Sequence, residues 1–313
     1  MSNIESDYKP FVVGAYAALP DGRQAQEMFY TALADTGYVT GIEIPVRAGS
    51  LDFDSPEWLA KTLAGRFPDS VITAIPDTMR NLGTDPNFGI ASPDKDGRAR
   101  GIAYIREVIN LGDNFNETAG TQVINRLELH SAPSKIAQEE WLVKSLEELL
   151  DDAKRSGIEL VLEHCDAREG NCIGCGVGPG EKQFLPFAAE VAACSAVGIP
   201  ITINWGRSVV ESHDPDTPAQ QVAELRKHGI LGGIMCSGAG AEATQYGPVW
   251  GDAHLPLQDD EPTSWMNAER AAKFIAAAEG AELYRGIKIQ TPRNFDVPAR
   301  IAAINRVYQA MVQ

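Results

Sequence analysis

The sequence predicts an α/β protein folded as a single (β/α)8 barrel, and three observations lead to that prediction. Short apolar runs alternate with amphipathic segments eight times, which is typical of parallel strands joined by helical crossovers. A chain of 313 residues has room for eight such units. The links from helix to strand are short, whereas several links from strand to helix are long. We therefore expect one domain over residues 1–313, with residues 1–9 flexible.

The predicted strands are short runs rich in β-branched and other apolar residues. In chain order they are residues 11–16, 41–45, 70–75, 122–130, 159–164, 200–205, 232–236 and 286–290. The predicted helices are longer segments with helical spacing of apolar residues, namely 25–36, 56–66, 97–111, 139–156, 185–196, 218–227, 267–278 and 298–312. Each strand is followed by one helix, as the repeat of a barrel requires.

Local signals mark where several of these helices begin and end. Ser55-Pro56 and Thr217-Pro218 are typical of an N-cap followed by a proline at the first helical position. Glycine adopts the left-handed conformation that ends many helices, and it follows the predicted helices at Gly37, Gly157, Gly198, Gly229 and Gly280.

Three predicted strand-to-helix links are long, at about residues 76–96, 165–184 and 237–265. In barrels of this type the loops after the strands gather at one end, where the active site lies. We therefore expect the site at the carboxyl ends of the strands.

The charge balance excludes two classes of partner. The chain holds 27 Lys and Arg against 43 Asp and Glu, a formal net charge of −16. Nucleic acids and anionic membranes attract basic surfaces, so neither is an expected partner. The N-terminus lacks the apolar region of a secretory signal, and no apolar run reaches the roughly 18 residues of a membrane span. With only five cysteines, these features favour a cytoplasmic protein with reduced thiols, and they leave a homo-oligomer open.

Polar residues gather where the predicted strands end. Parallel barrel strands are buried on both faces, so a polar side chain there is costly unless it meets a partner or a ligand. The residues concerned are Glu43, Asp77, Glu128, His130, Glu163, His164, Asn204, Arg207, Cys236, Ser237, Lys288 and Gln290. Such a concentration predicts a functional site.

Four of these residues are the catalytic candidates, namely Glu163, His164, His130 and Lys288. Glu163 and His164 are adjacent in one strand, so only one of them can face the barrel axis. Glu128 and His130 are two residues apart and share a face. Lys288 could hold an anionic group, donate a proton or form a Schiff base; the alternative is an ion pair with Glu163 or Glu43.

The candidates for substrate binding are Glu43, Glu128, Asn204, Arg207, Trp205, Cys236 and His254. His254 follows Asp252 by two positions in a long loop, a combination that suits acid–base or metal chemistry. Structural alternatives stay open, because Glu128 could instead pair with Arg126 and a tryptophan more often packs than stacks on a sugar.

The loop after the fifth strand holds Cys172 and Cys175 in CxxC spacing, within a glycine-rich segment at residues 174–180. A structural zinc site usually needs two such pairs, and a thioredoxin-type pair opens a helix, so both interpretations are weak. The glycines also leave backbone N–H groups free for an anion, with a plain flexible rim as the alternative.

Two strand segments resemble a known family. Residues 41–45 (GIEIP) and 160–164 (LVLEH) look like the second and fifth strands of the xylose isomerase-like TIM barrels, which include sugar isomerases and ketose 3-epimerases. The chain also resembles a domain-of-unknown-function group of that superfamily from actinobacteria and related bacteria. The resemblance implies a sugar or sugar-phosphate substrate.

The resemblance also bears on a metal. In epimerase-like members, Glu, Asp, His and Glu at the ends of strands five to eight hold a divalent ion. In this chain those positions are taken in order by Glu163, by Asn204, by Cys236 or Ser237, and by Lys288 or Gln290. Mn, Mg or Zn held by Glu163 with Asn204 or His130 is therefore allowed, but the four-ligand set is not intact. Because Lys288 would repel a dication, we expect no metal bound in the epimerase manner.

The leading functional hypothesis is an enzyme that isomerises, epimerises or eliminates on a carbohydrate or polyol derivative by removing a proton next to a carbonyl. Glu163 would be the base or a metal ligand, and His130 or His164 would be the proton partner. Lys288 or Arg207 would hold the developing negative oxygen.

Two alternatives stay open. The first is a metal-dependent hydrolase or phosphodiesterase whose ion is bound by His130, His164, Asp252 and His254. The second is a carbohydrate-binding barrel without catalysis, which would bind a ligand and not turn it over.

Overall fold

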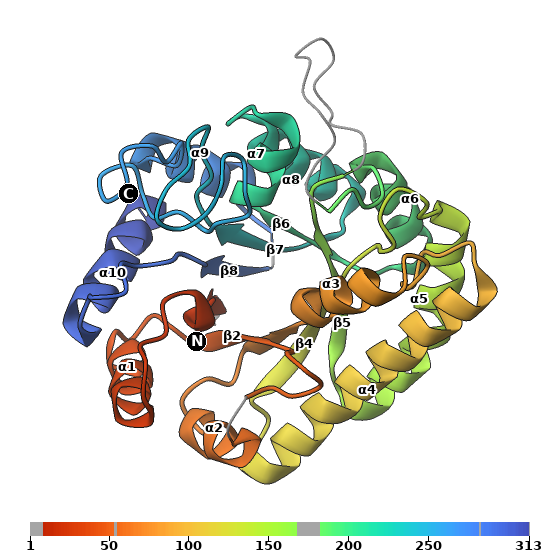
Figure 1. The fold of residues 1–313 in the computed structure, drawn as a ribbon, viewed down its shortest axis with the longest axis horizontal. Helices are drawn as coiled ribbons and strands as arrows, with labels where there is room; N and C mark the ends of the chain where they lie inside the picture. The colour runs from red at the N-terminus through yellow and green to blue at the C-terminus, as the bar shows by residue number, and fades with distance from the viewer. Residues whose placement is uncertain (1–8, 53–54, 168–181, 282, 313) are drawn as a thin grey trace, which may run out of the picture.

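The computed structural model describes residues 9–52, 55–167, 182–281 and 283–312, and its strands form a closed barrel (Figure 1). The eight parallel strands follow one another in chain order, and the last pairs with the first, with Val12 opposite Gly286. They are β1 (Phe11–Val13), β2 (Gly41–Pro45), β3 (Ser70–Thr73), β4 (Ile124–Leu129), β5 (Glu159–His164), β6 (Ile201–Asn204), β7 (Leu231–Cys236) and β8 (Tyr284–Ile287). The predicted (β/α)8 barrel is confirmed.

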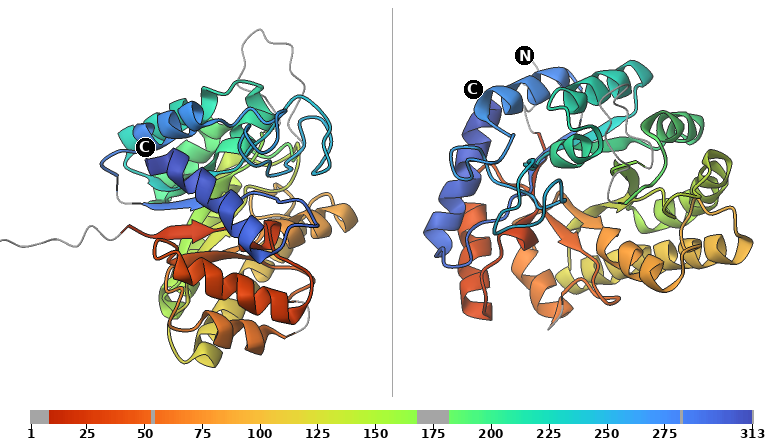
Figure 2. Two further views of the ribbon diagram at one scale, coloured as in Figure 1. Left: turned by 90° about the vertical axis from the view of Figure 1, so that its left-hand side faces the viewer. Right: turned by 45° about the horizontal axis from the view of Figure 1, so that its top comes forward.

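Helices cover the outside of the barrel (Figures 1 and 2). Those that correspond to predicted helices are α1 (Arg23–Asp35), α2 (Pro56–Leu63), α4 (Lys95–Ala119), α5 (Glu139–Ser156), α6 (Phe187–Val197), α8 (Thr217–His228), α9 (Ala268–Ala277) and α10 (Val297–Val312). Among the described residues, none of the helices has both the length and the apolar character needed to cross a membrane.

Three helical segments at the carboxyl ends of strands were not predicted: the 3-10 turn η1 (Ala15–Ala17), α3 (Ile75–Thr84) and α7 (Trp205–Ser212). Each begins within two residues of a strand end, so the predicted strand ends at residues 16, 75 and 205 are wrong. The α3 helix also fills part of the predicted link at 76–96. Its proline lies in the first turn, where a missing N–H costs no hydrogen bond.

Other boundaries follow local signals closely. The limits of β2, β5 and α5 agree with the prediction, and Ser55 caps α2 by accepting a hydrogen bond from the Trp58 backbone N–H at 3.2 Å. Thr217 lies inside α8 rather than before it. β8 lies earlier than predicted, because the chain beyond it bonds to a loop: the Gln290 N–H donates to the His254 carbonyl at 2.7 Å.

The barrel interior has a small apolar floor beneath the polar mouth. Val12, Val71, Met235 and Tyr284 pack together there, separate from the larger core between strands and helices. The Tyr284 hydroxyl donates to Glu128 Oε1 at 2.5 Å and lies 2.8 Å from the Thr202 hydroxyl. Because every polar atom here is buried, these bonds fix the ring in one position.

The first and last segments lie side by side and close the barrel, with red α1 next to blue α10 in Figures 1 and 2. The rings of Tyr38 and Tyr308 stack at 3.6 Å, and Phe11 meets both edge-on. The Tyr38 hydroxyl donates to Asn305 Oδ1 at 2.6 Å. These contacts join the two ends of the described chain.

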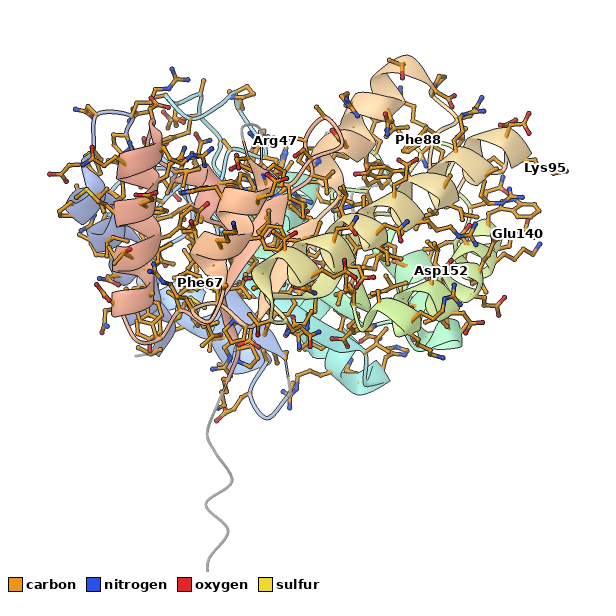
Figure 3. The ribbon with its side chains drawn as sticks, turned by 90° about the horizontal axis from the view of Figure 1, so that it is seen from below. Arg47, Phe67, Phe88, Lys95, Glu140 and Asp152 are labelled. Atoms are coloured by element: carbon orange, nitrogen blue, oxygen red, sulfur yellow. The ribbon has the colours of Figure 1, made fainter. Side chains whose placement is uncertain are left out.

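The helices α4 and α5 run in the same direction, as successive crossover helices of a parallel barrel do. Lys95 and Glu140, near their first turns, lie at the same edge of the molecule (Figure 3). Arg106 of α4 pairs with Glu148 and Asp152 of α5 at 2.9 and 2.7 Å. These partly exposed pairs link the two helices and add little stability.

We expect Gly233→Ala to destabilise the fold. A Cβ atom at residue 233 would lie 2.5 Å from the Tyr284 ring, which its hydrogen bonds hold in place. Overpacking of this kind costs about 1–3 kcal/mol, measurable by urea denaturation. The control is Gly83→Ala in α3, where a Cβ meets nothing within 4 Å and should be neutral or stabilising. Equal effects at the two sites would contradict this account.

Candidate functional site

The mouth of the barrel gathers polar side chains from five strands. Glu43 comes from β2, Glu128 from β4, Glu163 from β5 and Asn204 from β6, and Lys288 directly follows β8. None of these residues is more than 1% exposed. These five buried polar residues therefore meet at the carboxyl ends of the strands, where we expect the site to lie.

Lys288 crosses the barrel axis to reach carboxylates on other strands. Its Nζ lies 2.5 Å from Glu43 Oε1 and 3.6 Å from Glu163 Oε1. A Cβ at residue 14 would fall 2.7 Å from Lys288 Cγ, so Gly14 leaves room for the lysine. Burial alone lowers the pKa of Lys288, but Glu163 and Glu43 outweigh it and raise the pKa well above its ordinary value. The amine is a fixed positive charge at neutral pH.

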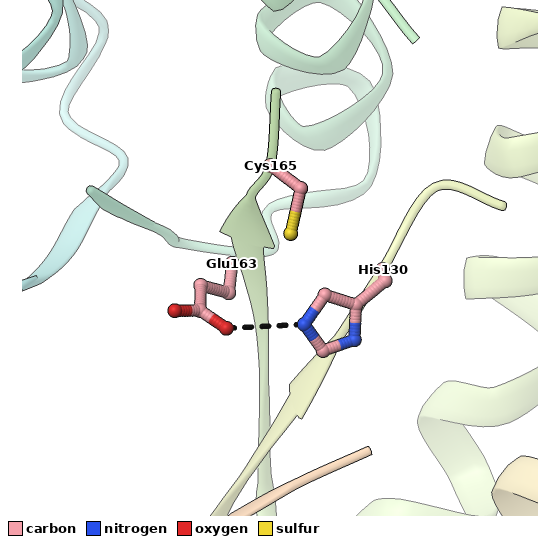
Figure 4. A group of neighbouring side chains, drawn as sticks. All are labelled: His130, Glu163 and Cys165. Atoms are coloured by element: carbon pink, nitrogen blue, oxygen red, sulfur yellow. Dashed lines mark hydrogen bonds and ion pairs between the residues drawn. The ribbon is translucent and has the colours of Figure 1, made fainter. Parts of the chain in front are cut away.

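Glu163 is contacted by cations and by an imidazole. Its Oε2 lies 3.0 Å from Arg207 Nη1 and 3.1 Å from His130 Nε2, the contact drawn in Figure 4. Burial raises the pKa of Glu163, but Arg207 and Lys288 overcome this and hold the pKa well below its ordinary value. The carboxylate is therefore ionised and is a weak base.

Arg207 enters the site from the first turn of α7. Asn204 caps that helix, because its Oδ1 accepts hydrogen bonds from the backbone N–H groups of Gly206 and Arg207 at 3.1 and 3.5 Å. The guanidinium, 1% exposed, lies between Glu163 and Asp252, whose Oδ2 is 3.2 Å from its Nε. The short helix α7, which the sequence did not predict, thus positions Arg207.

Asp252 ties the loop after β7 to the rest of the mouth. Besides Arg207, its carboxylate pairs with Lys182 Nζ at 3.1 Å and with His254 Nδ1 at 3.3 Å. The His254 ring also lies 2.9 Å from the Ser237 hydroxyl. The predicted neighbours Asp252 and His254 are therefore in contact, at the rim of the site.

Burial determines the protonation of the remaining groups. It raises the pKa of Glu43, and it raises the pKa of Glu128 well above its ordinary value, which favours the protonated form of Glu128. It lowers the pKa of His130 to about 4 and that of His254 to about 3, so both imidazoles are neutral as well. The fixed charges near the axis are then those of Lys288, Arg207 and their carboxylate partners.

Several fully buried polar atoms of the mouth have no hydrogen-bond partner among the described residues: Oε2 of Glu43, Oγ1 of Thr73, Oε2 of Glu128, Nδ1 of His130 and Nδ2 of Asn204. Leaving a buried polar atom without a partner costs about 1–3 kcal/mol. A cluster of them is expected where a polar ligand supplies the missing hydrogen bonds. Together they offer both donors and acceptors to a small molecule.

His164 lies on the opposite face of β5 from Glu163, outside the barrel. Its Nδ1 is 2.5 Å from Glu190 Oε2 of α6, and its Nε2 is 2.9 Å from Glu211 Oε2 of α7. Burial lowers its pKa, but the two carboxylates overcome this and raise the pKa of His164 to about 10. The structure therefore separates His164 from the other catalytic candidates and makes it a charged link between strand and helices.

Two predicted substrate contacts also face away from the axis. Trp205 and Cys236 belong to the core between strands and helices, and both are at most 1% exposed. The neighbour of Cys236, Met235, is the residue that packs inside the barrel. In β7 the period of two places the sulfur of the methionine, not the thiol, in the interior.

Asp77 and the CxxC cysteines, which the sequence also singled out, are not among the described residues that meet at the mouth. Asp77 lies in the first turn of α3, where its carboxylate accepts hydrogen bonds from the backbone N–H groups of Ala48 and Gly49 at 2.9 and 2.8 Å. It supports the loop after β2. Cys172 and Cys175 lie outside the described residues.

Sequence reasoning missed several residues of the mouth. Thr73 and Cys165 could have been found, because each lies two positions from an inward residue, Val71 and Glu163 respectively. Tyr16 carried no such signal, since it follows β1 in an unpredicted 3-10 turn. Its ring centroid lies 5.7 Å from Lys288 Nζ.

Three residues could hold a metal ion by their spacing. The ligand atoms of His130, Glu163 and Cys165 lie within 4.8 Å of one another, and all three side chains are buried (Figure 4). Imidazole, carboxylate and thiolate are ligands that zinc accepts. The same space is shared by a protein cation, because Arg207 Nη1 contacts both Cys165 Sγ and Glu163 Oε2.

Two comparisons identify relatives that match most of the chain. A family model described as "Domain of unknown function (DUF4862)" matches residues 12–303. The "Uncharacterized protein STM3670" of Salmonella typhimurium is 32% identical over 292 residues, which cover 89% of each chain.

Three solved structures share the architecture at low identity. A xylose isomerase domain containing protein from Salmonella typhimurium has a TM-score of 0.61 at 12% identity, covering 97% of this chain and 98% of its own. An L-ribulose 3-epimerase has a TM-score of 0.60 at 14% identity, covering 97% and 94%. The IOLI protein with a binding zinc atom has a TM-score of 0.59 at 12% identity, covering 97% of each chain. The resemblance to xylose isomerase-like barrels is confirmed as a likeness of fold.

We expect His164→Gln to destabilise the protein by about 3–5 kcal/mol, because two buried carboxylates lose their cation. The folded-state pKa is raised from 6.5 to about 10, so this stabilisation is complete below pH 6.5 and is lost as pH rises through 10. Urea denaturation of wild type and variant at pH 6, 8 and 10 measures both effects.

The exposed His228→Gln serves as the matched control, since His228 pairs with Glu224 at the surface rather than in the interior. A His164→Gln protein that keeps the wild-type decline in stability between pH 7 and 10 would refute this assignment.

Proposed function

The chain belongs to the DUF4862 family, and we propose that it is an isomerase or epimerase of a carbohydrate derivative that removes a proton from the carbon next to a carbonyl. One observation carries the proposal: a buried carboxylate, an ammonium and a neutral imidazole meet at the barrel mouth, among polar atoms that have no hydrogen-bond partner in the part of the chain that the structure describes. Barrels of this fold class carry their active sites at that end. The L-ribulose 3-epimerase of the same fold is consistent with the proposed reaction.

Glu43 is the proposed base. Burial raises the pKa of Glu43, which makes its carboxylate a stronger base than an ordinary one. Its Oε2 has no partner among the described residues and can accept the proton, while Oε1 pairs with Lys288. The sequence had favoured Glu163 for this role, but two cations and His130 hold that carboxylate in its ionised form.

Lys288 is the proposed stabiliser of the developing oxyanion. When Glu43 takes the proton, the C–H electron pair forms a carbon–carbon double bond and the carbonyl pair moves onto oxygen. An ammonium group 2.5 Å from the base faces that charge in a site from which water is excluded. Delivery of a proton to the opposite face of the same carbon gives the epimer. Delivery to the former carbonyl carbon, while the proton of the neighbouring hydroxyl moves to the former carbonyl oxygen, gives the isomer.

The remaining polar atoms are proposed to bind hydroxyl groups. With His130 Nε2 directed at the ionised Glu163, Nδ1 is the lone-pair side of the ring and can accept a hydrogen bond. Asn204 Nδ2 and the neutral Glu128 can donate. This mixture suits a small polyhydroxylated molecule.

The approach to Glu43 is proposed to run beside β2. A cavity of about 100 Å³ is lined by Glu43, Tyr16, Arg47 and Trp58 among others. Arg47, labelled in Figure 3, lies with its guanidinium 5.3 Å from the Tyr16 ring centroid. These aromatic and charged groups would meet a substrate before it reaches the base.

The alternative of a metal-dependent hydrolase finds less support. Its four ligands include His164, which lies on the outer face of β5 between Glu190 and Glu211. The alternative of a binding barrel without catalysis uses the same polar atoms, so only turnover separates it from an enzyme.

We expect the wild-type protein to exchange the proton at the reacting carbon of one sugar in a panel of aldoses, ketoses and keto-sugars for solvent deuterium, read by NMR. Glu43→Gln should lower that rate at least about 100-fold, because the base is lost while the shape is kept. Glu140→Gln, on the exposed surface of α5, should leave the rate unchanged.

If a sugar binds tightly and no sugar of the panel shows exchange, the protein is a carbohydrate-binding barrel without catalysis. Exchange that survives in Glu43→Gln would remove Glu43 from the role of base.

A further inference from the structure

We propose that Arg207 and Lys288 replace a catalytic metal: they supply, as parts of the chain, the positive charge that a divalent ion would bring to this barrel mouth. The protein accordingly takes no metal ion there. The catalytic part of this inference rests on the proposed function, whereas the metal part stands on the geometry alone.

The strand-end positions of the epimerase-type ligand set do not fit a divalent ion. After Glu163, the next position is Asn204, whose oxygen caps α7. At the third, Ser237 Oγ bonds to His254, and Cys236 faces outward. At the fourth, the Gln290 amide donates to two backbone carbonyls, at 3.1 and 2.7 Å, and Lys288 is itself a cation. Divalent ions are bound by anionic oxygen, imidazole or thiolate, and this set offers one such group.

The carboxylate that remains already has its cations. Lys288 Nζ lies 3.6 Å from Oε1 of Glu163, and Arg207 Nη1 lies 3.0 Å from Oε2. Both cationic side chains are at most 1% exposed, so solvent screens them little. A dication bound to Glu163 would face two fixed positive charges at close range.

The other grouping, His130, Glu163 and Cys165, meets the same obstacle. Arg207 Nη1 contacts two of its three ligand atoms, so the guanidinium lies where an ion would have to lie. Arg207 is held in this position at two points. Its backbone N–H donates to Asn204 Oδ1, the cap of α7, and its Nε lies 3.2 Å from Asp252 Oδ2. The spacing suits zinc, but the arginine occupies the position.

The two cations divide the work that one ion would do. Lys288 stands beside Glu43 and faces the oxygen that gains charge in the proposed reaction. Arg207 contacts Glu163, Cys165 and Asp252 and holds Glu163 within reach of Lys288. Lys288 is thus the catalytic residue and Arg207 the positioning residue.

The first test measures metal directly. Wild-type protein is dialysed against zinc or manganese chloride, then against metal-free buffer, and its metal content is determined by mass spectrometry. We expect less than about 0.1 ion per chain. A content near one ion per chain would overturn the proposal, whatever the activity of the protein.

The second test asks whether removal of the arginine creates a zinc site. Arg207→Ala frees the ligand atoms of His130, Glu163 and Cys165, so we expect its zinc affinity, measured by titration calorimetry, to rise at least tenfold over wild type. Arg207→Lys keeps the charge and should remain metal-free, as should the surface control Arg226→Ala. Equal zinc affinity in wild type and Arg207→Ala would contradict the proposal. If Arg207→Ala does not fold, which circular dichroism shows, the metal content of wild type and Arg207→Lys decides.

The third test concerns catalysis. EDTA should leave the deuterium exchange of the wild type unchanged. Lys288→Met should lower kcat at least about 100-fold, with no recovery on addition of manganese or zinc. Arg207→Lys should lower kcat far less than Lys288→Met and leave KM nearly unchanged, since it keeps the charge that positions Glu163. Loss of exchange in EDTA, with recovery in manganese, would overturn the proposal.

The two ideas fail separately. No exchange with any sugar, together with a metal-free wild type and a zinc site in Arg207→Ala, would reject the proposed function and support the replacement of the metal. Exchange by a protein that carries one ion per chain would support the proposed function and reject the replacement of the metal.

Discussion

The structure of the barrel mouth depends on one buried carboxylate that is paired with two cations. Glu163 meets Lys288 on one oxygen and Arg207 on the other, in a place that water does not reach. A charge removed from water is tolerated only when it is paired and hydrogen-bonded, and loss of one partner from such a pair typically costs about 3–5 kcal/mol. Each further feature of the site serves this arrangement: Gly14 makes room for the lysine, and Asn204 starts the helix that delivers the arginine.

The fold of the barrel does not by itself determine the charges at its mouth. At 12–14% identity to the solved structures, the eight-stranded frame is shared and the strand-end residues are free to differ. Opposite charges need only to be near each other, so a cation can come from a side chain as well as from solution. The fold fixes where the site lies, and the residues at the strand ends determine its chemistry.

Much of the fold followed from the sequence because its signals are local. The limits of β2, β5 and α5 agree with the structure, since apolar runs, charged helix ends and a glycine after Ser156 are read within a few residues. The short helices α3 and α7 were not predicted, because eight to ten residues at a strand end have no long periodic pattern and are held by tertiary contacts.

The site was predicted only in part for a related reason. Alternation shows that Glu163 and His164 face opposite ways but not which of them faces inward. The choice depends on Glu190 and Glu211, which lie on helices far along the chain and offer the imidazole two carboxylates. The pairing of Lys288 with Glu43 was considered from the sequence, whereas the contacts of Arg207 required the unpredicted turn of α7.

The contact between the two ends of the barrel has a consequence for synthesis of the protein. Tyr38, which follows α1, and Asn305 of α10 are in contact although 267 positions separate them, and Lys288 directly follows the last strand. While the ribosome is still making the chain, Glu43 and Glu163 have been translated and their lysine has not. The nascent barrel therefore cannot bury both carboxylates as ions before β8 arrives, and the charged centre and the closed barrel are completed by the same late step.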